Sequence, residues 1–215
     1  MSLTRQQLSQ ELIDIALAVK RQRLNVGRAG NISVRHKSGF LITPSAVEYD
    51  NLASRDIVYI NRHGHIKSDR YKPSSEWMLH RDIYATRPDI SAIIHIHSVY
   101  ATAVACLRHD LPAIHYMIAI AGGDTIRCAP YRLFGSQELS DIVCDALKDR
   151  YACLMANHGL IVCGETLEQA FEIGNEVEQL CQIYLQCLSA GQVQILSGAE
   201  MQIVLGKFKQ YRPTE

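Results

Sequence analysis

Hydrophobic residues recur along the chain with two periods, one helical and one extended. Repeats at three and four residues predict amphipathic helices at about 5–24, 98–107, 166–188 and 201–211, and a further helix is expected at 136–148. Short apolar and β-branched runs predict strands at 32–35, 39–43, 57–60, 65–67, 91–98, 115–121 and 153–162, the last interrupted at His158-Gly159. The chain is therefore expected to contain both helices and strands.

The composition is that of a globular protein with one core. The chain has 215 residues, 47% of them hydrophobic and 20% charged, which suits one well-buried core better than two ordinary domains. Lys+Arg and Asp+Glu both number 22, so charge predicts neither nucleic-acid nor membrane binding. The 7 cysteines include no Cys-x-x-Cys pair, which favours reduced thiols in the cytoplasm. We expect one cytoplasmic domain over residues 1–215, without a signal segment or membrane span.

The strand predicted at 91–98 carries His95 and His97, two residues apart. Because alternate side chains of a strand point to the same face, both imidazoles should project from one side of a rigid element. Two neutral imidazoles held in this way make up most of a divalent-metal site. The alternative is a pair of hydrogen-bonded histidines near a sheet end, which this spacing alone does not exclude. His158, at the break beside Gly159, is a candidate third ligand from a separate element.

A predicted helix start carries the second group of candidates. Ser74 or Ser75 is expected to cap a helix that ends before Pro88, which places Glu76 in the first turn. There the helix dipole stabilises a carboxylate, and free backbone amides beside two serine hydroxyls can hold a phosphate. An ordinary acidic first-turn residue is the alternative. His80, four residues on, shares the face of Glu76 and is expected to pack beside the site rather than bind a metal.

Two weaker features complete the set of candidates. The junction Gly27-Arg28-Ala29-Gly30-Asn31 permits positive φ and exposes backbone amides, as an anion-binding nest requires, and Arg28 adds a positive charge. A plain turn explains the same glycines. Tyr116, in the strand predicted at 115–121, is by itself best explained as a core tyrosine.

Several short motifs follow one another in the order typical of the class II aldolase/adducin family, which the chain resembles from about Leu24 to Tyr211. They are Gly30-Asn31-Ile32-Ser33, Ile42-Thr43-Pro44, Pro73-Ser74-Ser75-Glu76-Trp77, His95-Ile96-His97-Ser98, Ile114-His115-Tyr116-Met117 and Asn157-His158-Gly159. The resemblance implies an α/β fold, a single domain with a mostly antiparallel central β-sheet flanked by helices in three layers. It also implies a homotetramer with active sites at subunit interfaces.

The resemblance further implies a role for each motif. The site would bind one Zn²⁺ per subunit, and its implied ligands are His95, His97, His158 and Glu76, the last becoming the base when substrate displaces it. The implied phosphate-binding residues are Asn31, Ser45, Ser74 and Ser75. The implied residues at the aldehyde end are Tyr116 and, from an adjacent subunit, Tyr211.

Two departures from the family pattern fall in the presumed phosphate region. Arg28 stands where sugar-phosphate aldolases of the family typically have Thr, and Ser45-Ala46 stands where they have Thr-Gly. Arg28 either strengthens phosphate binding as a charge-assisted donor or narrows the pocket and changes which ketose phosphate fits.

The expected reaction is reversible retro-aldol cleavage of a ketose 1-phosphate to dihydroxyacetone phosphate and a small aldehyde, without a Schiff-base lysine. Decarboxylases and a ketopentose-phosphate 4-epimerase share the family scaffold. The epimerases typically place Asp at the position of Glu76, which favours the aldolase. A non-enzymatic interaction domain like adducin should lack the histidines present here, and a closed structural zinc site normally contains Cys.

Overall fold

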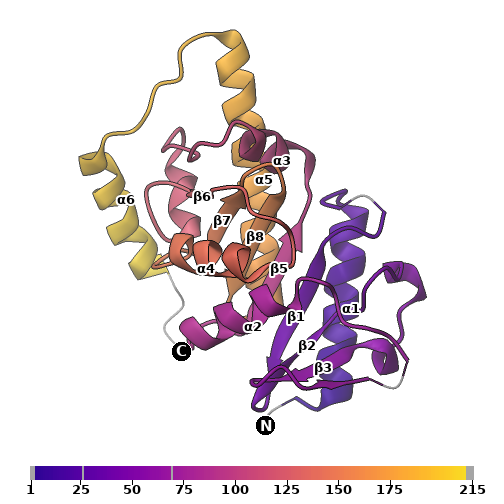
Figure 1. Cartoon of the computed structure of the whole chain (residues 1–215). Helices are drawn as coiled ribbons and strands as arrows, with labels where there is room; N and C mark the ends of the chain where they lie inside the picture. Colours follow the sequence, from indigo (N-terminus) through magenta and orange to yellow (C-terminus); the bar gives the residue numbers. More distant parts are fainter. Residues whose placement is uncertain (1–2, 26, 69, 212–215) are drawn as a thin grey trace.

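The structure, a computed structural model, describes residues 3–25, 27–68 and 70–211, with side chains as far as residue 208. Its described strands form one 8-stranded sheet in the order β4-β3-β2-β1-β5-β8-β7-β6 (Figure 1). Neighbouring strands are antiparallel except for β6 and β7, which are parallel. The strands are β1 (Asn31–His36), β2 (Gly39–Ile42), β3 (Val58–Asn61), β4 (Ile66–Lys67), β5 (Ala92–Ile96), β6 (Cys128–Ala129), β7 (Ala152–Met155) and β8 (Gly159–Gly164). The prediction of a mostly antiparallel α/β fold is confirmed.

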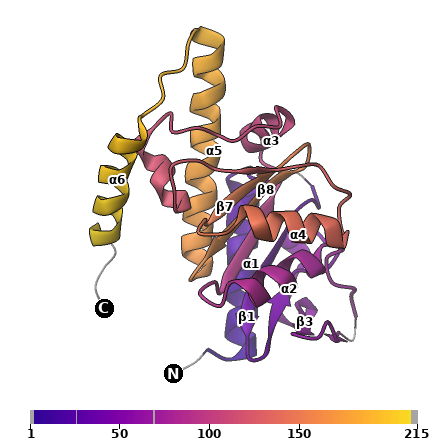
Figure 2. The same cartoon turned by 60° about the vertical axis from the view of Figure 1, so that its left-hand side comes forward.

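Helices cover both faces of this sheet, which gives three layers (Figure 2). On one face lie α1 (Arg5–Arg21), α3 (Val99–Cys106) and α5 (Leu167–Ala190), and on the other lie α2 (Trp77–Thr86) and α4 (Gln137–Ala146). The last helix, α6 (Gly198–Tyr211), packs against the 3₁₀-helix η3 (Tyr116–Ala121). Two further 3₁₀-helices, η1 (Tyr49–Asn51) and η2 (Ser54–Asp56), precede β3.

The central strand β5 shows how the sequence divides the core between the two faces. Ala92, Ile94 and Ile96 pack into the cluster that contains α1 and α5, whereas Ile93 packs into the cluster that contains α2 and α4. Both sets are buried, as expected for a central strand covered on both sides. The same alternation turns His95 toward the α2 layer, because residues two apart share a face.

The strand predicted at 115–121 is wrong, because this segment forms η3. The His115 side chain accepts a hydrogen bond from the backbone N–H of Met117 at the start of η3 (3.3 Å), and Gly122 adopts a left-handed φ of 89° at its end. A short apolar run fits a helical turn as well as a strand. Here the two capping residues favour the helical turn.

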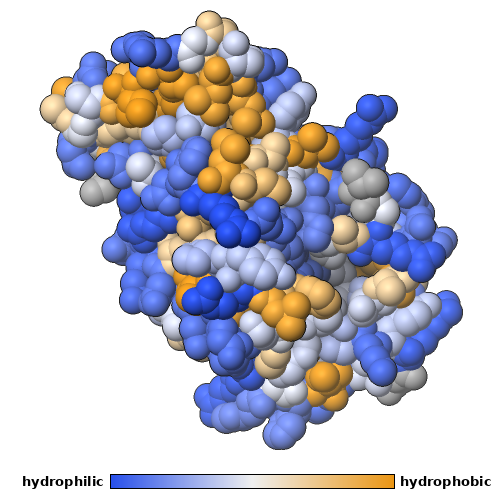
Figure 3. All heavy atoms as spheres, turned by 45° about the horizontal axis from the view of Figure 1, so that its top comes forward, coloured by the Kyte–Doolittle hydropathy of each residue, from blue (hydrophilic) through white to orange (hydrophobic). Residues whose placement is uncertain are grey.

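Apolar side chains also gather on the surface. Figure 3 shows a hydrophobic patch at the upper left, on the part of the molecule formed by α6, the end of α5 and the segment between them. On these segments Leu188, Ile195 and Ile203 are exposed, with exposed fractions of 45%, 59% and 66%. A contiguous apolar surface of this kind is typical of an interaction site. Among the described helices, none has the length and hydrophobicity that a bilayer span requires.

Candidate active site

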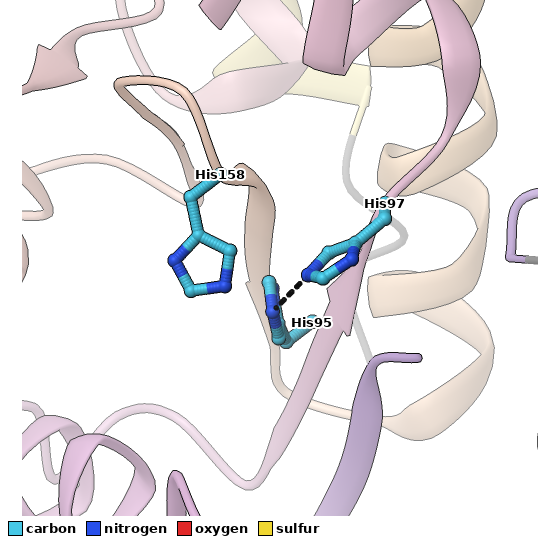
Figure 4. Close-up of side chains that lie close together, drawn as sticks. All are labelled: His95, His97 and His158. Carbon is cyan, nitrogen blue, oxygen red and sulfur yellow. Dashed lines mark hydrogen bonds between the residues drawn. The ribbon is translucent and has the colours of Figure 1, made fainter. Parts of the chain in front are cut away.

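Three histidines converge at one end of the central strands. His95 lies in β5, His97 directly follows it, and His158 lies in the turn between β7 and β8 (Figure 4). The antiparallel pairing of β5 with β8, in which Ile96 is opposite Leu160, brings the two segments together. The candidate ligand nitrogens of the three rings all lie within 4.8 Å of one another. The structure therefore brings the three predicted histidines together.

Glu76 faces the same point from the α2 layer. Its Oε2 lies 3.2 Å from Nε2 of His95, and its Oε1 lies 3.4 Å from Nε2 of His158. The Oε1 atom is buried and has no hydrogen-bond partner among the described residues. A buried carboxylate oxygen without a donor is costly unless a cation or a ligand completes its environment.

The start of α2 differs in detail from the prediction. The helix begins at Trp77, and Glu76 is its N-cap residue, so Ser74 and Ser75 lie in the turn before the helix and do not cap it. The Ser74 hydroxyl instead accepts a hydrogen bond from the backbone N–H of Glu76 (3.3 Å). This contact holds Glu76 at the helix start. The prediction had placed Glu76 inside the first turn, whereas it is the residue just before that turn.

The four side chains fit a divalent cation. Ligands at roughly 2.0–2.1 Å from a tetrahedral centre lie about 3.3–3.4 Å apart. The two Nε2 atoms of His95 and His97 are 2.9 Å apart, and the two separations to Glu76 are 3.2 and 3.4 Å. In addition, Nδ1–H of His95 donates to the carbonyl of Leu160 (3.0 Å), so the neutral ring would offer Nε2 to a metal. The His95, His97 and His158 triad can therefore bind a metal.

Burial and mutual proximity set the charges in this cluster. Burial, followed by the neighbouring charge of His95, lowers the pKa values of His97 and His158 to about 4. Burial also opposes charge on His95, but the carboxylate of Glu76 outweighs it and raises the pKa of His95. The pKa of Glu76 is lowered despite burial, because His95 and His158 stabilise the carboxylate. At neutral pH the site thus presents an ionised carboxylate beside neutral His97 and His158.

A cavity of about 380 Å³ opens beside the cluster. All six residues predicted to bind substrate or phosphate line it, namely Arg28, Asn31, Ser45, Ala46, Ser74 and Ser75. Glu76, His97 and His158 line it too, so the candidate metal site and the candidate phosphate site share one cavity. As predicted for this junction, Gly27 and Gly30 adopt positive φ, of 67° and 75°.

Of the two predicted tyrosines, the structure describes the side chain of Tyr116 alone. Tyr116 begins η3, is 50% exposed and is not among the residues that line the cavity. The side chain of Tyr211 lies outside the described residues, so nothing here places it. Both roles stay predictions, and that of Tyr211 depends on an adjacent subunit.

Sequence reasoning missed three cavity-lining residues and one supporting contact. The loop between β6 and α4 contributes Tyr131, Arg132 and Phe134 to the cavity. The only local signal was a pair of aromatic residues between Pro130 and Gly135. Behind His97, the side-chain carbonyl of Asn25 accepts a hydrogen bond from the His97 backbone N–H (2.7 Å), which ties the α1–β1 loop to the end of β5.

Comparison with known proteins agrees with this geometry. The family model described as "Class II Aldolase and Adducin N-terminal domain" matches residues 10–185. The chain belongs to the class II aldolase and adducin family. An L-fuculose phosphate aldolase of Escherichia coli K12 is 47% identical over 210 residues, which cover 97% of each chain. A 5-methylthioribulose-1-phosphate/5-deoxyribulose-1-phosphate aldolase of Rhodospirillum rubrum is also 47% identical, over 93% of this chain and 90% of the relative.

A solved structure gives the same result for the fold. It is described as an L-fuculose 1-phosphate aldolase, superimposes with a TM-score of 0.92 at 39% identity, and covers 97% of this chain and 98% of its own. With relatives of this kind over nearly its whole length, the protein is a class II aldolase, a carbon–carbon lyase. Aldolases of this class are metal-dependent, in agreement with the convergent histidines.

Proposed function

We propose that the protein is a zinc-dependent aldolase that cleaves a ketose 1-phosphate to dihydroxyacetone phosphate and a small aldehyde. One observation carries the proposal: three imidazoles and an ionised carboxylate meet at the edge of a cavity that also has hydroxyl and guanidinium groups. The imidazoles suit zinc, and the serine-rich wall suits a phosphate. L-Fuculose 1-phosphate, with L-lactaldehyde as its aldehyde product, is the first candidate substrate.

His95, His97 and His158 would hold the cation, with Glu76 as a displaceable fourth ligand. When bound, the cation supplies Lewis-acid stabilisation of the negative charge that develops at the ketone oxygen during cleavage. Asn31, Ser45, Ser74 and Ser75 orient the phosphate end of the substrate, and Arg28 adds a charge-assisted donor.

Glu76 is the proposed base at the carbon of dihydroxyacetone phosphate. Cleavage breaks the bond between C3 and C4 of the ketose and leaves the bonding electrons on the dihydroxyacetone phosphate fragment. In the synthetic direction the ionised Glu76 removes a proton from that carbon. In the cleavage direction the C4 hydroxyl loses its proton, and Glu76, protonated by exchange with solvent, returns a proton to the carbon. Tyr116 or Tyr211 of a neighbouring subunit would take or give the proton on the aldehyde oxygen.

The candidate substrates differ at the end that becomes the aldehyde, so substrate specificity depends on that end. The relative that acts on 5-methylthioribulose 1-phosphate and 5-deoxyribulose 1-phosphate is as similar as the L-fuculose phosphate aldolase of Escherichia coli K12. Arg28 and Ala46 also depart from the pattern of the fuculose enzymes at the phosphate wall. These two deoxy-ketose phosphates are therefore the second candidates for the same reaction.

We also propose a homotetramer whose active sites include residues of two subunits. The cavity is open on the side of Tyr131 and Phe134, which are 50% and 61% exposed, and the patch at α6 and the end of α5 is apolar. Surfaces of this kind are expected to be covered by another copy of the chain.

The test is a panel of ketose 1-phosphates incubated with zinc-replete protein, with release of dihydroxyacetone phosphate coupled to a reductase. L-Fuculose 1-phosphate and the two deoxy-ketose phosphates are expected to give product. The Glu76→Gln variant is expected to keep its zinc but lose turnover. No product from any substrate contradicts the aldolase and favours decarboxylase or epimerase chemistry on the same scaffold.

A further inference from the structure

Behind the cavity, polar side chains of β1 and α2 interleave in one buried row. Asn31 and Ser33 are alternate residues of β1, and Glu76, His80 and Tyr84 are spaced four apart at the start of α2 and along it. Two residues of a strand advance by about 6.6 Å and four residues of a helix by about 6.0 Å, so the two rows can interlock. All five residues are buried, with exposed fractions of 6% or less.

Each member of the row contacts the next. Nδ2 of Asn31 donates to Oε2 of Glu76 at 3.0 Å. Oδ1 of the same amide lies 2.5 Å from Nε2 of His80. Nδ1 of His80 lies 2.6 Å from the Ser33 hydroxyl, which in turn lies 2.9 Å from the hydroxyl of Tyr84.

The chemistry of these groups fixes the direction of every hydrogen bond. A carboxylate only accepts, so Asn31 must present its Nδ2–H to Glu76 and its Oδ1 to His80. Since Oδ1 also only accepts, the imidazole must carry its proton on Nε2. Burial, followed by the charge of His95, lowers the pKa of His80 to about 3, so the ring is neutral and its Nδ1 is an acceptor.

The remaining two bonds follow from the neutral ring. The Ser33 hydroxyl donates to Nδ1 of His80. Its oxygen accepts from the Tyr84 hydroxyl, which lies nearer to Ser33 (2.9 Å) than to the carbonyl of Ser91 (3.4 Å). Every donor in the row therefore points toward Glu76. The reverse orientation of the Asn31 amide would place its oxygen against the carboxylate and its NH₂ against a ring N–H.

We propose that His80 is a positioning residue of this aldolase. Its Nε2–H donates to Oδ1 of Asn31 and thereby locks the amide in the orientation in which Nδ2–H donates to Glu76. Ser33 and Tyr84 act one step further back, because the Ser33 hydroxyl donates to Nδ1 of this tautomer and the Tyr84 hydroxyl contacts Ser33. The lock holds Oε2 of Glu76 by a hydrogen bond, while Oε1 keeps no protein donor among the described residues. The second N–H of the amide is left for the cavity, which Asn31 lines. The inference rests on the proposed role of Glu76 as the base.

A spectroscopic measurement tests the lock without any assay of activity. In protein labelled with ¹⁵N-histidine, long-range ¹H–¹⁵N correlations identify the protonated ring nitrogen, and His80 is assigned by the loss of its signals in His80→Gln. We expect the Nε2–H tautomer for His80 in the wild type. A wild-type ring protonated at Nδ1 overturns the proposal, whatever reaction the protein catalyses.

A kinetic measurement tests whether the lock serves Glu76. Exchange of the carbon-bound proton of dihydroxyacetone phosphate in D₂O, followed by NMR, needs the base but no aldehyde. His80→Leu is expected to slow this exchange by about 10- to 100-fold with zinc content unchanged, as for other residues that orient a metal-site group. His80→Gln keeps an N–H donor and is expected to recover most of the rate. Ile83→Val, in the same helix and fully buried, controls for loss of core packing.

The effect must pass through Asn31. In an Asn31→Ala background, His80→Leu is expected to slow proton exchange by less than about twofold, because the amide that His80 orients is absent. If wild type and His80→Leu exchange the proton at the same rate, the inference is overturned and the proposed function is not. The same holds if His80→Leu slows exchange in the Asn31→Ala background by as much as it does in the wild type. Absence of exchange in the wild type overturns the proposed function, and this inference with it.

Discussion

The carboxylate of Glu178 provides the sharpest test of how the fold supports the candidate metal site. It lies on α5 and accepts three hydrogen bonds at the start of α3: from the Ser98 hydroxyl (2.6 Å), from the backbone N–H of Tyr100 (2.9 Å) and from that of Ala101 (2.8 Å). Ser98 is the N-cap of α3 but makes no capping bond with its own side chain. Glu178 therefore caps a helix to which it does not belong, directly after His97.

Glu178→Ala removes this cap and leaves three donors without their acceptor. A helix cap contributes about 0.5–2 kcal/mol, and a hydrogen bond to a charged group about 1.5–3 kcal/mol. Because Tyr100 is partly exposed, water replaces part of the loss. We therefore expect the free energy of unfolding to fall by about 2–3 kcal/mol, or about 4–12 °C in Tm.

The assay is urea unfolding followed by circular dichroism, at one protomer concentration because assembly shifts apparent stability. Glu172→Ala, an exposed glutamate on the same helix, is the matched control and should change stability by less than about 0.5 kcal/mol. Glu178→Ala should also lose its metal faster to a chelator, because the segment after His97 is no longer held. Equal stability of the two variants would refute the reasoning.

Three further predictions concern the same site. His95→Ala should retain less than about 0.1 equivalent of zinc by atomic emission, and a full equivalent would contradict the ligand set. In Gly159→Ala, the new Cβ would lie 2.5 Å from a β5 carbonyl and 2.8 Å from Cδ2 of His97. A destabilisation of about 1–3 kcal/mol and weaker zinc binding are expected, whereas Gly206→Ala, with no atom within 4 Å, should not destabilise. The pKa of His80 is about 3 in the folded protein and 6.5 ordinarily. Between pH 3 and pH 6.5, the His80 ring is therefore protonated in the unfolded chain and neutral in the folded one. The unfolding free energy of metal-free protein should therefore fall on acidification from pH 6 to pH 4. His80→Leu should reduce that slope by about 1.4 kcal/mol per pH unit, and an unchanged slope would show that the ring is not buried neutral.

Local periodicity was enough to predict that His95 in β5 and His97 just after it form a candidate metal site, and that Glu76 lies near a helix start. A strand alternates its faces whatever surrounds it, so His95 and His97 had to point the same way. Local pattern failed where two structures suit the same residues. The apolar run 115–121 has no decisive period, and the cap made by His115 and the left-handed Gly122 favoured a 3₁₀-helix.

The sequence by itself thus determined which side chains could form the site, because strand pleat, helix start and glycine freedom are local properties. Only the tertiary structure decided that they meet. The register of β5 against β8 brings His158 to the other histidines, and the packing of α2 on β1 interlocks Asn31 with Glu76 and His80. Both depend on contacts between residues far apart in the chain, whose geometry no local period encodes.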